Sequence, residues 1–183
     1  AEALLAKKSG VEVIITDHHH LPEILPEALA IIHPLLDDHY PFKSLSGGGV
    51  AFKLAQALIK DTRFPGPAAI KESSEKWLLD LVAISTVADL MPLIGENRTL
   101  VKYGLVVLSK TKNLGLQKLF SEAAINPAKI DAFTIGYQIA PRINAAGRMA
   151  HANSAYQLLV TENLEEAITI AHQLNKRNSE RQQ

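Results

Sequence analysis

The chain has 183 residues, of which 47% are hydrophobic and 21% charged, a balance typical of a globular protein. It contains no cysteine, which excludes disulfides and thiolate metal sites, so any metal must be held by His, Asp or Glu. The formal net charge is zero, so only a local patch could support nucleic-acid binding. No apolar run is long enough to span a membrane, and the lack of a signal-peptide pattern predicts an intracellular, cytoplasmic protein.

The first part of the chain predicts alternating helices and strands, as in a parallel α/β sheet. Residues 1–9 predict a helix that ends at Gly10, and residues 11–16 predict a buried strand. A loop with a short helix is expected over 21–30, followed by a second strand over 30–33. Gly47-Gly48-Gly49 then opens an amphipathic helix, and the Pro- and Gly-rich residues 61–70 predict a loop.

The second part of the chain predicts helices almost throughout. The expected helices cover residues 75–88, 97–110, 113–124 and 131–140, and a last helix begins after Asn163 with a capping box to Glu166. The helix over 75–88 is apolar on nearly all sides, which predicts burial, and Pro92 predicts its end near Asp89. The chain starts in a helical pattern without Met and stops inside a polar helix, so we expect a piece of a longer protein.

The run Asp17-His18-His19-His20 follows directly on the strand predicted over 11–16. In open α/β sheets, ligands bind at the carboxyl ends of the strands. Carboxylate and imidazole groups suit a divalent transition metal such as Mn²⁺ or Zn²⁺. Neighbouring residues can serve one site only if the strand has ended, as Leu21-Pro22 suggests. The alternative is a polar strand end with solvated histidines.

Asp89 is the second residue with an unusual context, because it ends an almost wholly apolar helix. A bare buried carboxylate costs several kcal/mol or shifts its pKa. A metal ion or a charged partner would offset that cost. The alternative is an Asp that reaches water or caps the next turn.

A third candidate is the stretch Pro141-Arg142-Ile143-Asn144-Ala145-Ala146-Gly147-Arg148, which combines two arginines and an asparagine with small residues. Arginine binds phosphate in a bidentate manner, and small residues let the backbone approach an anion. The alternative is a helix-to-loop junction with two solvated arginines. The three glycines at 47–49 could also bind an anion at a helix N-terminus, but this feature alone favours a tight turn without a ligand.

The remaining cations and imidazoles predict no site by themselves. The C-terminal cations Lys176, Arg177 and Arg181 are most simply a solvated helix face, and the isolated histidines are treated as structural or surface residues: His33, His39, His151 and His172.

Together these motifs resemble, in their order, those of the DHH phosphoesterase superfamily. Thr16-Asp17-His18-His19 after a strand resembles its signature. The stretch from 45 to 54 is similar to the segment that follows in RecJ-type single-stranded-DNA-specific exonucleases, and residues 85–98 and 141–148 resemble the next two RecJ motifs. Residues 174–182 resemble the start of the helix beyond the catalytic domain. The resemblance covers essentially the whole chain.

The resemblance assigns roles to individual residues. His18 matches a metal ligand, His19 the neighbour near the scissile phosphate, and Asp17 the residue that supports both. Asp89 matches a metal-bridging or metal-ligating carboxylate. Contacts to the DNA backbone are implied for Arg148 and, by a weaker match, for Arg142 and Asn144. The catalytic set is therefore Asp17, His18, His19 and Asp89, with His18 and Asp89 as metal ligands.

The family uses Mn²⁺ or Mg²⁺ to hydrolyse single-stranded DNA from the 5′ end, in DNA repair and recombination. A single-strand-binding protein is a candidate further partner, and a membrane is not expected. The implied fold is α/β: the later part of a parallel-sheet DHH domain, with few strands and a helix-rich second half. Residues 1–160 would form a partial DHH catalytic domain, and residues 161–183 would start a linking helix.

Family members also carry Asp-containing motifs before the DHH sequence and DNA-binding parts beyond the linking helix. Both would lie outside residues 1–183, so we expect the chain alone to be inactive or nearly so. Two other functions remain open. One is another DHH phosphoesterase that acts on oligonucleotides, cyclic dinucleotides or pyrophosphate, and the other is a non-catalytic DNA-binding scaffold of the same fold.

Overall fold

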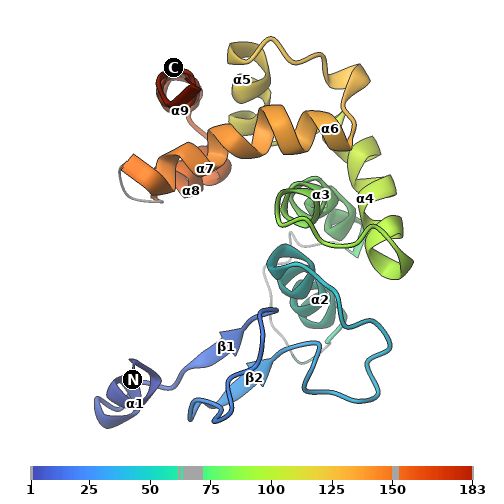
Figure 1. Ribbon diagram of the computed structural model, residues 1–183, viewed down its shortest axis with the longest axis vertical. Helices are drawn as coiled ribbons and strands as arrows, with labels where there is room; N and C mark the ends of the chain where they lie inside the picture. The colour runs from blue at the N-terminus through green and yellow to red at the C-terminus, as the bar shows by residue number, and fades with distance from the viewer. Residues whose placement is uncertain (1, 62, 64–71, 150–152, 183) are drawn as a thin grey trace.

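The computed structural model of the chain describes residues 2–61, 63, 72–149 and 153–182, without the side chains at 72, 73, 146–149 and 182. The sheet lies at one end and a group of helices at the other, with α3 and α4 between them (Figure 1). The elements in chain order are α1 Glu2–Lys8, β1 Ile14–Thr16, β2 Ala30–Ile32, α2 Gly47–Lys60, η1 Glu72–Leu78, α3 Leu79–Ala88, α4 Gly95–Leu108, α5 Leu114–Glu122, η2 Pro127–Lys129, α6 Ala132–Thr134, η3 Ile135–Ile139, α7 Ala140–Met149, α8 Asn153–Val160 and α9 Leu164–Gln182.

The two strands pair in parallel, as the αβ pattern predicts, with Ile14 opposite Ala30 and Thr16 opposite Ile32. Gly10 ends α1 with a φ of 72°, which is the left-handed conformation expected of a C-terminal glycine. Both strands are shorter than predicted, and the short helix expected over 21–30 does not form. Pro22 and Pro26 explain why this helix is missing, because proline cannot donate the backbone hydrogen bonds of a helix interior.

Helix α2 begins at the predicted glycines and has Ser46 as its N-cap. The Ser46 hydroxyl accepts a hydrogen bond from the Gly49 amide at 3.1 Å and lies 3.1 Å from the Thr86 hydroxyl of α3. Ser46 and Thr86 are both fully buried. This polar pair therefore fixes the start of α2 against α3. The loop predicted over 61–70 lies outside the described residues, apart from 61 and 63.

The apolar segment predicted as one helix over 75–88 divides into the 3-10 helix η1 and the α-helix α3. Its first part is only half-buried, because Trp77 and Leu78 are each 39% exposed. The predicted end of the helix is confirmed. Asp89 is the C-cap of α3, and Leu90 follows with a φ of 54°.

The helices α6, η3 and α7 form one continuous rod (Figure 1). The helix-to-loop junction considered for 141–148 is therefore wrong, since α7 runs to Met149. A proline ring normally clashes with the carbonyl four residues earlier. Here η3 is a π-helical turn directly before Pro141, and its wider backbone gives the proline ring room.

Helix α9 packs on α5, α7 and α8 and contributes Ala167, Ala171 and Leu174 to the core, all fully buried. Asn163 caps this helix as predicted, by accepting hydrogen bonds from the amides of Glu165 and Glu166. The reciprocal half of the capping box is absent among the described contacts, because the Glu166 carboxylate accepts from Thr161 and Gln157 instead. In the described part of the chain, no helix combines the length and apolar character that a membrane span requires.

Candidate metal centre and adjoining cavity

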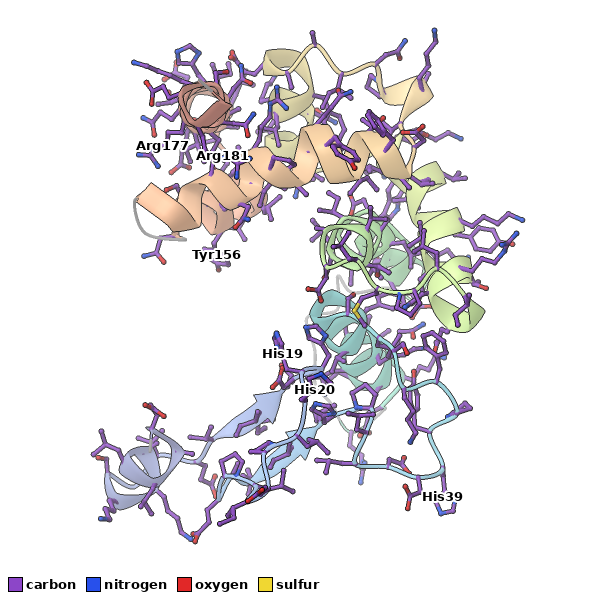
Figure 2. All side chains as sticks on the ribbon, viewed as in Figure 1. His19, His20, His39, Tyr156, Arg177 and Arg181 are labelled. Atoms are coloured by element: carbon purple, nitrogen blue, oxygen red, sulfur yellow. The ribbon has the colours of Figure 1, made fainter. Side chains whose placement is uncertain are left out.

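The Asp17–His20 segment is a tight loop at the carboxyl end of β1. One oxygen of Asp17, Oδ1, accepts hydrogen bonds from the His18 amide at 2.7 Å, the His19 amide at 3.3 Å and the His19 Nδ1 atom at 2.7 Å. The bond from His19 lowers the pKa of Asp17 to about 2 and raises the pKa of His19. Asp17 therefore shapes the loop, and the His19 side chain is 75% exposed (Figure 2).

His18 reaches toward helix α3, with its ring centroid 4.3 Å from that of His19. Its Nε2 atom lies 3.2 Å from Oδ2 of Asp89, with side chains that are 13% and 42% exposed, respectively. Asp89 is thus half-exposed, and its desolvation cost is smaller than its position at the end of an apolar helix predicts. Asp89 caps the C-terminus of α3, where the helix dipole disfavours a negative charge, so a nearby cation would stabilise it.

The first turn of α2 packs against both the His18 ring and helix α3 and leaves little room for side chains. A Cβ atom on Gly47 would lie 3.3 Å from Cδ2 of His18, and one on Gly48 would lie 2.6 Å from Cβ of Ser85. The Gly48 amide donates to the Ser85 hydroxyl at 3.0 Å. The glycines predicted as a turn or an anion site therefore serve to bring the His18 loop and α3 together.

The donor set fits a divalent cation. Single ligand atoms from Asp17, His18 and His19 all lie within 4.8 Å of one another, and Asp89 faces His18. Adjacent ligands of an octahedral ion at about 2.1 Å lie about 3 Å apart, close to the separation of His18 and Asp89. Imidazole and carboxylate donors without sulfur suit Mn²⁺ and related ions. These four side chains therefore form a set of donors that fits part of the coordination shell of a divalent ion.

A cavity of about 610 Å³ adjoins Asp89 and extends between α3, η3, α7, α8 and α9. Among its lining residues are Ser85, Asp89, Asn144 and Arg181. Figure 2 places Arg181 on the side of α9 that faces α7 and α8. One predicted DNA-contacting residue, Asn144, thus shares a cavity with the predicted metal ligand Asp89. The lining of the cavity thus includes both a cationic side chain, Arg181, and a carboxylate, Asp89.

Arg142 of the 141–148 stretch is not among the described residues that line this cavity. Arg142 donates through Nε to Oδ1 of Asn175 at 2.8 Å and through NH1 to the Gln138 carbonyl at 2.6 Å. Burial lowers the pKa of its guanidinium. These contacts tie α7 to α9, which is a structural function. Arg148 lies in α7, and its side chain is not among those that the structure describes.

Sequence reasoning missed three residues around the site. The sequence predicts a solvated helix face for Arg181, because helical periodicity does not indicate which side of a terminal helix faces a cavity. Ser85 is an ordinary residue in an apolar helix. His33 was treated as structural, and the only available signal was its position directly after a strand, as for Asp17. His151 lies outside the described residues.

Residues 1–86 match the family "DHH family, N-terminal domain". Over 182 residues the chain is 43% identical to the single-stranded-DNA-specific exonuclease RecJ of Bacillus subtilis. The alignment covers 99% of this chain and 22% of that protein. It is 40% identical to the Escherichia coli RecJ, over 97% of this chain and 32% of that protein. The chain therefore spans less than a third of the length of these curated relatives.

Solved RecJ structures have the same fold. A manganese-bound exonuclease RecJ superimposes with a TM-score of 0.82 at 36% identity, covering 99% of this chain and 44% of that one. The Mn²⁺ complex of Thermus thermophilus RecJ superimposes with a TM-score of 0.80 at 37% identity, and the match covers 96% of this chain and 25% of that one. A Mg²⁺ complex of the T. thermophilus protein also matches. The α/β fold with few strands and a helix-rich second half is thereby confirmed, and the chain is similar over nearly its whole length to the RecJ proteins, with a DHH family match over residues 1–86.

Proposed function

We propose that the protein hydrolyses phosphodiester bonds of single-stranded DNA from the 5′ end, with Mn²⁺ or Mg²⁺, in DNA repair and recombination. The observation that carries the proposal is the 3.2 Å approach of His18 and Asp89 at the edge of the cavity that also holds Asn144 and Arg181. The similarity to RecJ proteins, named as single-stranded-DNA-specific exonucleases, supports the choice of substrate.

His18 and Asp89 would hold the divalent ion, and Asp17 would keep the loop in the conformation that directs His18 toward α3. When bound, such an ion supplies a hydroxide at neutral pH and neutralises charge on the leaving oxygen. Donors from outside this chain would complete the ion's coordination shell, in line with the sequence-based expectation that the chain alone is inactive or nearly so.

The phosphate would be oriented by side chains next to the ion. Arg181 and Asn144 lie in the cavity beside Asp89 and can donate to phosphate oxygens. His19 donates its Nδ1 proton to Asp17, which fixes the orientation of the exposed His19 ring beside the proposed ion. Arg148 remains a candidate backbone contact, whereas the contacts of Arg142 favour a structural function.

We further propose that residues 1–160 form part of the DHH catalytic domain and that 161–183 begin the linking helix. The packing of α9 on α5, α7 and α8 supports a rigid attachment of that helix. A single-strand-binding protein stays a predicted partner that rests on the family resemblance.

The test is Mn²⁺-dependent degradation of 5′-labelled and 3′-labelled single-stranded DNA by the full-length gene product. His18→Ala and Asp89→Ala are compared with His39→Ala, a histidine on a distant exposed loop (Figure 2). We expect both site variants to lose activity by at least about 100-fold, because a metal ligand is removed, while the His39 variant keeps it.

A dinucleotide substrate distinguishes the alternatives. Rapid cleavage of dinucleotides with little action on long strands would favour an oligonucleotide phosphoesterase. DNA binding without any cleavage would favour the scaffold function and would contradict the proposal.

A further inference from the structure

His33 follows β2 directly and is 6% exposed, between the Asp17–His20 loop and the turn that begins at Pro34. We propose that His33 is a positioning residue for the metal-binding loop: its ring holds the backbone of His19 and thereby sets the direction of His18. This inference rests on the proposed metal site but adds a residue that neither the motifs nor the family resemblance assigns.

Two hydrogen bonds determine the tautomer of His33. The Leu35 amide donates to Nδ1 at 3.1 Å, so Nδ1 must accept. The Nε2 atom lies 2.8 Å from the His19 carbonyl oxygen, which can only accept, so Nε2 carries the proton and donates. Both ring nitrogens are therefore engaged, and His33 cannot itself be a metal ligand without losing one of these bonds.

The bond to His19 continues the sheet where its backbone ladder ends. The last ladder pair is Thr16 and Ile32, and the Asp17 amide still donates to the Ile32 carbonyl at 3.1 Å. Beyond that point the loop turns away from β2, and the His33 side chain supplies the next connection between the two segments. The loop is thus stabilised by the hydrogen bonds of Asp17 within it and by the bond from His33, which follows β2.

This second connection has a direct consequence for His18. The residue lies between the two fixed points, the Asp17 amide and the His19 carbonyl, and its ring reaches Asp89 with the loop in this conformation. Partners that orient metal ligands without touching the ion typically change metal affinity by about 10- to 100-fold when removed. Loss of the His33 bond to His19 should therefore weaken metal binding.

A purely structural function is the competing explanation, because the Leu35 bond also stabilises the turn after β2. Two substitutions separate the two bonds. In His33→Asn, the amide oxygen takes the place of Nδ1 and can still accept from the Leu35 amide, as in an Asx-turn, but no donor reaches His19. In His33→Gln, the longer side chain places an N–H donor near the position of Nε2.

The experiment measures Mn²⁺ affinity by calorimetry, thermal stability, and kcat and KM on single-stranded DNA for the full-length gene product. We expect His33→Asn to raise the Kd for Mn²⁺ by about tenfold or more and to lower kcat, with a Tm close to that of the wild type. His33→Gln should recover Mn²⁺ affinity to within about threefold of the wild type, with the same donor restored. His39→Asn serves as the control and should leave all three quantities unchanged.

The inference is overturned if His33→Asn binds Mn²⁺ as the wild type does, or if its affinity falls only in proportion to a lower Tm. His18→Ala distinguishes this failure from failure of the proposed function. If His18→Ala loses Mn²⁺ binding while His33→Asn retains it, the metal site is correct and the positioning function of His33 is not. If His18→Ala also retains Mn²⁺, the metal site itself is wrong, and the positioning function falls with it.

Discussion

The Nε2 atom of His18 lies 3.2 Å from Oδ2 of Asp89, although one residue follows β1 and the other ends α3. Helix α2 connects them, since Gly47 lies against the His18 ring and Gly48 against Ser85, one turn before Asp89. The facing of the two candidate ligands therefore depends on the close packing of the α2 backbone against both segments.

A Gly48→Ala substitution should separate the two ligands. The added Cβ would lie 2.6 Å from Cβ of Ser85, so α2 and α3 must move apart. We expect about a tenfold weaker affinity for Mn²⁺ and a loss of stability of about 1–3 kcal/mol, typical of overpacking. Calorimetric titration and thermal unfolding measure both effects. The double variant Gly48→Ala with Ser85→Gly provides the missing room and should recover part of the affinity. Unchanged affinity in the single variant would show that this contact does not set the distance.

Arg181 should contribute to binding of the DNA substrate and not to binding of the metal. It lines the cavity next to Asp89, and a charge-assisted hydrogen bond to phosphate contributes about 1.5–3 kcal/mol. We therefore expect Arg181→Gln to raise KM for single-stranded DNA about 10- to 100-fold with unchanged Mn²⁺ affinity. Lys176→Gln removes the same charge from an exposed position on α9 and is the control. Equal effects of both substitutions would indicate only a general loss of positive charge.

The sequence predicts well those features that depend on local chemistry. The strand-ending Asp17–His20 run and the helix-ending Asp89 stand out because polar groups follow apolar runs, and both lie at the predicted ends of their elements. Asn163 occupies the predicted helix N-cap for the same reason, since its side chain satisfies free amides within the first turn.

Features that depend on tertiary contacts could not be predicted in this way. The facing of His18 and Asp89 requires the whole α2 helix to be in place, and it was expected only through the family resemblance. Arg181 reaches the cavity because α9 packs back on α7, which no local pattern specifies. Pro141 predicts a helix end in isolation, and only the π-helical turn before it allows the helix to continue.

Leu90 is expected to be a strained position whose replacement by glycine stabilises the protein. Its φ of 54° is costly for a residue with a Cβ, and its side chain is 90% exposed, so little packing is lost. We expect Leu90→Gly to raise the free energy of unfolding by roughly 1 kcal/mol, as measured by denaturant titration. Ala124→Gly, at a φ of 52°, should act in the same direction. Ala123→Gly, at a φ of −89°, is the control and should lower stability.

Asp80 should make the protein less stable at neutral pH than in mild acid. The residue is 4% exposed, and burial raises its pKa, although the Thr111 hydroxyl donates to it at 2.5 Å. A carboxyl whose pKa is higher in the folded state binds its proton more tightly there, so its ionisation lowers stability as pH rises through that pKa. Asp80→Asn is permanently neutral, and its amide can donate to the Thr111 hydroxyl. We expect a higher Tm than that of the wild type at pH 7, with the difference shrinking as the pH falls toward the range of an ordinary carboxyl.

Asp131 provides a control of opposite sign for the Asp80 experiment. Its carboxylate caps α6 and accepts from the Thr134 amide at 2.7 Å, and these hydrogen bonds lower its pKa. The stabilisation by Asp131 is therefore present above the pKa of the unfolded chain and is lost as pH falls through the lower, folded-state pKa. Asp131→Ala should lower the Tm at pH 7, and this loss should diminish in acid. If Asp80→Asn also lowered the Tm at pH 7, the ionised Asp80 would be a net stabilising partner of Thr111, and burial would not be the dominant influence on its charge.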